Sequence, residues 1–456
     1  MSIDAVTALY PPKVRAGRYG ERFPLVMLDV IRNPLSSWPA EVYEQPIVSR
    51  VGPLGSFTWV MDPGLIKTVL LEAQDRFLKT PIEKRVLGPL LGNSVFTTDG
   101  ADWRWQRQVV APLFRHGELL RYVPAMTAAA ETTLATWRAQ GAGERDIEHD
   151  MTATTFKIIA DTLLPGGDTF VARAIERAHA DYLMPISWEI AFGMLDLPRW
   201  LPHPGTRSMR RSERELRAAV AALITARRRN PGFADDLFSR LLSARHPDTG
   251  APMSDAQLID NLLTFLAAGH ATTAMALTWS LYLLAKAPDW QDRLASEARD
   301  VAGEAPIGAE HIQHLPLTEM VVKEAMRLYP PAPVVMRQAG EDIELGGRVL
   351  GKGNLVLVPI YALHRHKSHW EDPDRFEPER FSAEAEETRA RYIYMPFGAG
   401  PRICVGMAFA MIEAKAVLAT LVRAMRFTPI DGCDPEPMSR LTLRPMGGMR
   451  LGVTPR

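Results

Sequence analysis

The longest charge-free segment of the chain constrains its fold more than any other feature. Residues 261–285 contain no Asp, Glu, Lys or Arg, and about 20 apolar residues are enough for a helix to cross a bilayer. The segment also carries Gly269, His270 and several threonines near its middle. A helix that is apolar on all sides is equally typical of the centre of a large soluble protein. We therefore expect a buried central helix and no membrane anchor.

The ends of this helix can be read from the sequence. Ser254 and Gln257 have the spacing of a capping box, and Pro288 lies just beyond Lys286. The predicted helix is about 50 Å long at 1.5 Å per residue. Gly269, in its middle, costs about 1 kcal/mol relative to alanine. A glycine at this position indicates that something bulky lies against the helix there.

Composition excludes several classes of protein. Lys and Arg number 53 and Asp and Glu also 53, so the net charge gives no attraction to nucleic acid. Hydrophobic residues make up 46% of the chain, enough for a large core. The two cysteines, Cys404 and Cys433, do not make a disulfide scaffold, which fits a cytoplasmic protein. The first residues lack the basic and apolar regions of a signal peptide.

A glycine-rich loop around Cys404 carries the most specific motif. Residues 397–406 read Phe-Gly-Ala-Gly-Pro-Arg-Ile-Cys-Val-Gly, and a helical pattern from 407 to 424 follows. The glycines permit left-handed backbone angles and let a large flat group approach the main chain. A thiolate at the start of a helix is stabilised by the free N–H groups there. These are the conditions for a cysteine that binds a metal. The spacing Phe-x-x-Gly-x-Arg-x-Cys-x-Gly resembles the haem-binding loop of the cytochromes P-450.

A second motif supports the resemblance. Trp103 and Arg107 lie on one face of a predicted helix that follows the Asp99-Gly100 turn, and they resemble the family's Trp-Arg-x-x-Arg helix. An indole N–H and a guanidinium can together hold a carboxylate, and haem carries two propionates. By resemblance, the haem contacts are expected to come from Trp103, Arg107, Arg337, Phe397, Arg402 and Gly406, with Cys404 as the axial ligand of the iron.

The middle of the central helix resembles the family's oxygen-activation motif. Ala268, Gly269 and Thr272 match it, and Thr272 is expected to position the proton donor. The acid that precedes the threonine in the family is replaced by Ala271. Oxygen activation consumes two protons, and a threonine needs a proton source behind it. Ordered water, His270 or an acid elsewhere in the chain remain open as that source.

Two further sets of residues are expected around the haem. Glu324 and Arg327, three residues apart, face each other on a predicted helix and match the family's Glu-x-x-Arg pair. Arg380 would share the same carboxylate, and we interpret all three residues as structural. Residues 441–445 are expected to form a strand. The substrate pocket is expected to be apolar and lined by Ala267, Ala268, Val334, Val335, Met336 and Leu441.

The resemblance covers residues 40–455 and implies the fold. It is mostly α with a small β lobe (α+β), a single-domain triangular prism over residues 41–456 after an irregular segment, 1–40. Residues 118–229 read as helices interrupted by a proline-rich stretch, which in the family covers the substrate channel.

The resemblance also implies the chemistry. A monomeric monooxygenase with haem b would insert one atom of O2 into a hydrophobic small molecule, by hydroxylation or epoxidation. Its electrons would come from a ferredoxin or flavodoxin with an NAD(P)H reductase. The alternatives are a peroxygenase that uses H2O2, a haem-thiolate enzyme that does not transfer oxygen, and a haem sensor without catalysis. The sequence does not identify the substrate.

Overall fold

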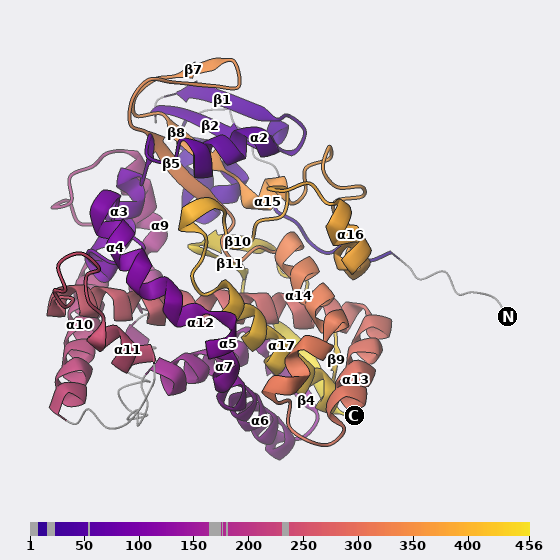
Figure 1. Cartoon of the computed structure of the whole chain (residues 1–456). Helices are drawn as coiled ribbons and strands as arrows, with labels where there is room; N and C mark the ends of the chain where they lie inside the picture. The colour runs from indigo at the N-terminus through magenta and orange to yellow at the C-terminus, as the bar shows by residue number, and fades with distance from the viewer. Residues whose placement is uncertain are drawn as a thin grey trace.

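Helices make up most of the protein (Figure 1). The structure is a computed structural model that describes residues 8–15, 23–52, 55–163, 175, 177–178, 181–229 and 237–456. The helices of these ranges include α1 (Phe23–Arg32), α2 (Pro63–Lys67), α3 (Pro81–Leu91), α4 (Gly100–Val110), α5 (His116–Leu119), α6 (Val123–Gln140), α7 (Ile147–Leu163), α9 (Ile186–Met194), α10 (Thr206–Arg229), α11 (Leu237–Ser243), α12 (Asp255–Lys286), α13 (Pro288–Ala302), α14 (Pro316–Leu328), α15 (Ile360–Leu363), α16 (Ala383–Thr388) and α17 (Met407–Ala424).

The strands of the described residues form one larger sheet and three small ones. A five-stranded sheet has the order β1-β2-β8-β5-β3, and the smaller sheets are β10-β11, β4-β12-β9 and β6-β7. In Figure 1 the larger sheet stands at one end of the molecule, away from most of the helices. The strands are β1 (Ile47–Gly52), β2 (Gly55–Val60), β3 (Phe77–Leu78), β4 (Gly143–Asp146), β5 (Val335–Ala339), β6 (Ile343–Leu345), β7 (Arg348–Leu350), β8 (Leu355–Val358), β9 (Met425–Thr428), β10 (Pro437–Arg440), β11 (Thr442–Pro445) and β12 (Arg450–Pro455).

The charge-free segment forms most of α12, which runs through the helical part of the molecule (Figure 1). The predicted capping box is present, with the Gln257 N–H donating to Ser254 Oγ at 3.2 Å. By length and composition α12 would also pass as a membrane span, but 78% of its most apolar window is buried inside the protein. It packs against α7, α14, α10 and α17. The expected buried central helix is therefore confirmed.

Two expectations about local structure differ from what is observed. The segment before residue 41, expected to be irregular, contains α1. The expected strand over 441–445 begins one residue later, because Leu441 forms the turn of the β10–β11 hairpin with a φ of 70°. A left-handed leucine is not visible in a strand-like pattern, since the pattern records apolar alternation and not backbone angles.

Candidate functional site

The Cys404 loop folds back on itself before α17 begins. The Cys404 N–H donates to the Phe397 carbonyl at 3.0 Å, closing the loop. Gly398 and Gly400 both have a φ of 72°. A Cβ on Gly400 would also lie 2.1 Å from the Leu70 carbonyl oxygen, so only glycine fits there. Gly406 differs from the expectation of a left-handed angle, because its φ is −84°. Its contribution is a backbone N–H bonded to the Cys404 sulfur.

The Cys404 side chain borders a space within the protein. Cys404 as a residue has accessible surface, but its thiol is largely surrounded by protein atoms, and this burial raises the pKa of the thiol. The Gly406 N–H and the Arg107 guanidinium act in the opposite direction and lower the pKa of Cys404. Within the described part of the chain, Arg107 has no carboxylate partner. A thiol with donors beside it and open space in front of it is suited to hold a metal.

Positive charge is in excess next to this space. Arg337 is buried, and its guanidinium donates to the Met336 carbonyl at 2.8 Å. No carboxylate of the described residues forms an ion pair with Arg337. Burial lowers the pKa of Arg337, and nearby Arg402 lowers it further, while Glu83 acts in the opposite direction. An arginine remains charged despite such shifts. The buried Arg337 guanidinium would therefore be stabilised by an anion, and no carboxylate of the described residues provides one.

Arg402 is placed differently from Arg107 and Arg337. Its guanidinium donates to Asp99 Oδ1 at 2.7 Å and to the Thr98 carbonyl at 3.0 Å. It also stacks on the Trp103 ring, 4.4 Å from the ring centre. Trp103 is buried at 9% exposure. The structure thus brings the predicted Trp103 and Arg402 together, with Arg402 already paired to a carboxylate.

Sequence reasoning missed one cation of this group, Lys79. Its ammonium lies 2.6 Å from Glu83 and 4.5 Å from the Phe96 ring centre. Burial lowers the pKa of Lys79, and so does nearby Arg337. Lys79 belongs to no motif, and only the fold places it beside Arg337. An excess of cations around an accessible thiol fits a flat cofactor that bears two carboxylates, and these residues are compatible with a haem.

An accessible strip interrupts the middle of α12. Ala268 is exposed and Ala267, Gly269 and Thr272 are partly so, although the helix is buried on both sides of this strip. Accessible residues at the centre of a buried helix line an internal space. The Thr272 hydroxyl donates to the Ala268 carbonyl at 2.7 Å. Three residues expected to act on oxygen, Ala268, Gly269 and Thr272, therefore share one accessible surface.

The bulky group expected beside Gly269 is a side chain of α7. A Cβ on Gly269 would lie 3.0 Å from Ile159 Cδ1 and 3.3 Å from its Cγ1. A second contact between the helices follows at once, where the Thr155 hydroxyl donates to the His270 carbonyl at 3.1 Å. Gly269 thus allows α7 to approach α12 closely.

Gly269→Ala is expected to destabilise the protein by roughly 1 kcal/mol. Overpacking against Ile159 costs about 1–3 kcal/mol, while alanine recovers about 1 kcal/mol of helix propensity. Ile159→Val removes the Cδ1 atom, so the double variant should be more stable than the sum of the single changes predicts. Urea unfolding of the four proteins measures this, and strict additivity would contradict the contact.

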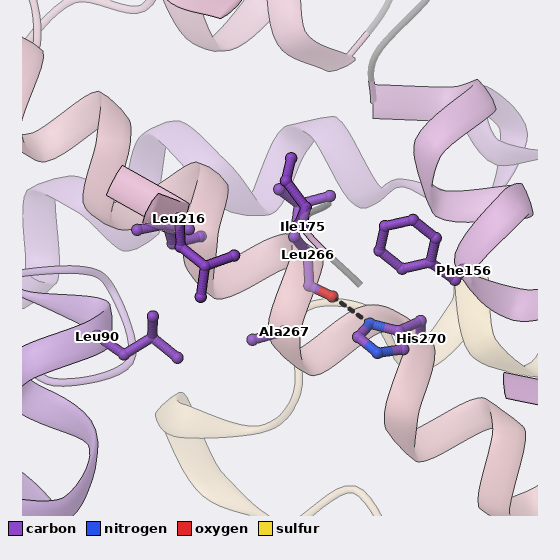
Figure 2. Close-up of a pocket in the computed structure, with 8 residues that line it drawn as sticks. Leu90, Phe156, Ile175, Leu216, Leu266, Ala267 and His270 are labelled. Atoms are coloured by element: carbon purple, nitrogen blue, oxygen red, sulfur yellow. Dashed lines mark hydrogen bonds between the residues drawn. The ribbon is translucent and has the colours of Figure 1, made fainter. Parts of the chain in front are cut away.

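His270 faces the core beside a small apolar pocket (Figure 2). Its Nδ1 lies 2.6 Å from the Leu266 carbonyl, and its ring meets the Phe156 ring edge-on at 5.2 Å. Burial lowers the pKa of His270 to about 4, so the ring is neutral at pH 7. A neutral imidazole held in this way is a poor source of protons. The pocket is lined by Leu90, Phe156, Ile175, Leu216, Leu263, Leu266, Ala267 and His270.

The remaining predicted lining residues come from two segments, the start of β5 and the tip of the β10–β11 hairpin. Val334 precedes β5, Val335 and Met336 begin it, and all three are partly accessible. Leu441 is 40% exposed at the tip of the β10–β11 hairpin. The hairpin is joined to α12 by the Trp279 indole, which donates to the Leu443 carbonyl at 3.0 Å.

Glu324 and Arg327 form a fully buried bidentate ion pair on α14, with N–O distances of 2.6 and 2.7 Å. Arg327 also donates to the carbonyls of Pro373 and Arg375, at 2.7 and 2.9 Å. Arg380 lies 3.9 Å from Glu324, a distance too long for a direct hydrogen bond. The pair therefore fixes the segment that leads towards the cysteine loop, and Arg380 contributes less than expected.

Comparison with known proteins agrees with this site. The family model described as Cytochrome P450 matches residues 41–451. Cyclooctatin synthase from Streptomyces melanosporofaciens is 33% identical over 86% of this chain and 85% of its own length. Cyclooctat-9-en-7-ol 5-monooxygenase from the same organism is 32% identical, over 87% of this chain and 85% of its own. Pentalenene oxygenase from Streptomyces avermitilis is 31% identical over 89% of both chains.

The fold has a match among solved structures. The crystal structure of the cytochrome P450DA heme domain superposes with a TM-score of 0.83, at 24% identity and with 98% of each chain covered. We conclude that the chain belongs to the cytochrome P450 family, as a monooxygenase that carries a haem with a cysteine thiolate as its axial ligand.

Proposed function

We propose that the protein inserts one oxygen atom from O2 into a C–H or C=C bond of a hydrophobic small molecule. Two electrons and two protons are consumed, and the second oxygen atom leaves as water. The apolar, accessible residues on α12, β5 and the β10–β11 hairpin carry this proposal. The relatives named for cyclooctat-9-en-7-ol and pentalenene support a hydrophobic substrate.

The residues have separate tasks in this proposal. The haem, when bound, supplies the activation of O2. Cys404 would provide the axial thiolate, and Gly406 would donate its N–H to the sulfur. Trp103, Arg107, Arg337 and Arg402, with Lys79, would hold the propionates. Phe397 would pack beside the sulfur. Thr272 would place a proton donor at the accessible strip of α12.

The electrons would come from a separate ferredoxin or flavodoxin with its NAD(P)H reductase. Turnover with such a chain, compared with turnover driven by H2O2 alone, tests the proposal. Product from the reductase chain supports it. Product from peroxide alone would instead favour a peroxygenase.

A panel of ligands tests the substrate class. Lauric acid, farnesol, testosterone and naphthalene represent four hydrophobic classes, and the change of the iron from low to high spin reports binding. We expect at least one of them to shift the spin state. The absence of a spin-state shift with all four ligands would contradict an apolar pocket.

Leu441→Gly and Leu441→Ala are expected to weaken ligand binding to a similar extent but to differ in stability. Both remove the side chain beyond Cβ, so both should weaken the spin-state shift of the best panel ligand. Glycine adopts the left-handed angle freely, whereas alanine keeps a strain of about 1 kcal/mol. The glycine variant should therefore unfold at a higher urea concentration. Unchanged ligand binding in both variants would place Leu441 outside the pocket.

A further inference from the structure

The small apolar pocket beside His270 lies behind the accessible strip of α12. Four of its lining residues have the i, i+3, i+4 and i+7 spacing of one helix face, namely Leu263, Leu266, Ala267 and His270. Ala268 and Thr272, the most accessible residues of the strip, lie on the opposite face of the same helix. The pocket is therefore separate from the space that the strip borders.

The other walls of the pocket come from neighbouring helices. Leu90 belongs to α3, Phe156 to α7 and Leu216 to α10. In the view of Figure 2, Leu90 and Leu216 stand on one side of the space and Phe156 and His270 on the other. Of the eight lining residues, only Ala267 is partly accessible, and the others are buried. The pocket is thus a cavity enclosed by buried side chains, and Ala267 forms its border with the strip.

The chemistry of this cavity selects a small apolar ligand. An internal water needs about two to four polar partners. Among the eight lining residues only His270 has a polar side chain, and its Nδ1 already lies 2.6 Å from the Leu266 carbonyl. Apolar cavities of this kind stay dry and bind apolar ligands such as xenon.

The size of the cavity excludes the hydrophobic substrate. The space accommodates a molecule little larger than water, whereas pockets for drug-sized ligands measure about 300–1,000 Å³. A diatomic gas meets both conditions, because it is apolar and small. Dioxygen is the diatomic gas that the proposed reaction consumes.

We propose that this cavity is a binding site for dioxygen, which it supplies past Ala267 to the accessible strip where Thr272 lies. Binding is non-covalent, so no bond forms or breaks and no electron moves in the cavity. Its effect is to raise the concentration of O2 next to the strip. This inference rests on the proposed O2 chemistry and deepens it.

Xenon is the direct probe of the cavity, because it is apolar, monatomic and visible in crystals pressurised with the gas. We expect a xenon atom between Leu216, Phe156 and His270 in the wild type. Leu263→Phe should fill the cavity and exclude xenon. Leu258→Phe is the matched control, at a buried leucine of α12 that is not among the lining residues, and it should keep xenon.

The same two variants test the cavity without any gas. In Leu263→Phe the added ring enters free space, so the urea midpoint of unfolding should equal or exceed that of the wild type. In Leu258→Phe the added volume enters a packed core and forces side chains away from their preferred rotamers. The urea midpoint of this control should therefore fall.

The dependence of turnover on O2 tests the supply. With the reductase chain and the best panel ligand, Leu263→Phe should raise the KM for O2 about tenfold, the equivalent of about 1.4 kcal/mol of lost binding. Its rate should approach that of the wild type as O2 nears saturation, because a store matters only when O2 is scarce. Leu258→Phe should keep the wild-type KM for O2.

Three results would overturn the inference. The absence of xenon from the wild-type cavity would refute the site, and so would an equal loss of stability in the two variants. A wild-type KM for O2 in Leu263→Phe would refute the supply of dioxygen. A wild type that forms product only from H2O2 would instead refute the proposed function, and xenon would still show whether the cavity binds a small apolar molecule.

Discussion

Cys404→Ser is expected to abolish the red-shifted Soret band of the reduced carbon monoxide complex and all monooxygenase turnover. The thiolate donates electron density to the iron and favours O–O cleavage. A serine hydroxyl stays protonated at neutral pH and is a far weaker ligand. The Gly406 N–H and the Arg107 guanidinium, which favour the thiolate of Cys404, would then have no anion beside them.

The same substitution at Cys433 is the control. Cys433 follows a turn and is partly exposed, so Cys433→Ser should keep both the band and the activity. Absorbance spectra of the reduced, carbon monoxide-bound proteins make the comparison. A Cys404→Ser protein that retained the band would refute the assignment of Cys404 as the ligand.

Glu324→Ala is expected to cause the largest loss of stability. It removes both oxygens that Arg327 contacts and leaves a buried guanidinium with carbonyl partners only. Breaking a buried pair in this way costs about 3–5 kcal/mol, a large share of the 5–15 kcal/mol that holds a typical protein folded. The N–H of Glu377, which donates to Glu324 at 2.8 Å, would lose its acceptor too. We therefore expect low haem content as well as an early thermal transition.

An exposed ion pair of the same length serves as the control. Lys367 and Glu44 also lie 2.6 Å apart, but their side chains are 67% and 59% exposed. Surface pairs contribute little, so Glu44→Ala should leave the thermal transition and the haem content unchanged. Similar losses in the two variants would show that burial does not set the effect.

Local patterns predicted most of the elements around the site. The capping box at Ser254 and the apolar run after it gave α12 within one or two residues. The helix after Cys404 begins and ends where the pattern does, at Met407 and Ala424. Glu324 and Arg327 are three residues apart on one helix, so their pairing was also predictable. Each of these features depends on neighbours close in the chain.

Contacts between distant segments were not predictable in this way. Lys79 reaches Arg337 because β3 pairs with β5, and no sequence motif records that pairing. Glu413 did carry a weak signal, because Glu413, Lys415 and Arg423 are the charged residues of an otherwise largely apolar α17. The sequence did not show that Lys415 pairs with Glu319, whereas both oxygens of Glu413 are buried without a hydrogen-bond partner among the described residues.

The sequence by itself determined the family, the axial cysteine of the loop and the long central helix, because each of them depends on motifs whose residues lie close together in the chain. It also showed that Ala271 stands where an acid is expected. Tertiary structure alone decided that Ala271 is enclosed and that Glu413, 142 positions further along the chain, lies beside the same helix. The physical reason is burial: whether a carboxyl is paired, exposed or held as a neutral acid depends on the elements packed around it.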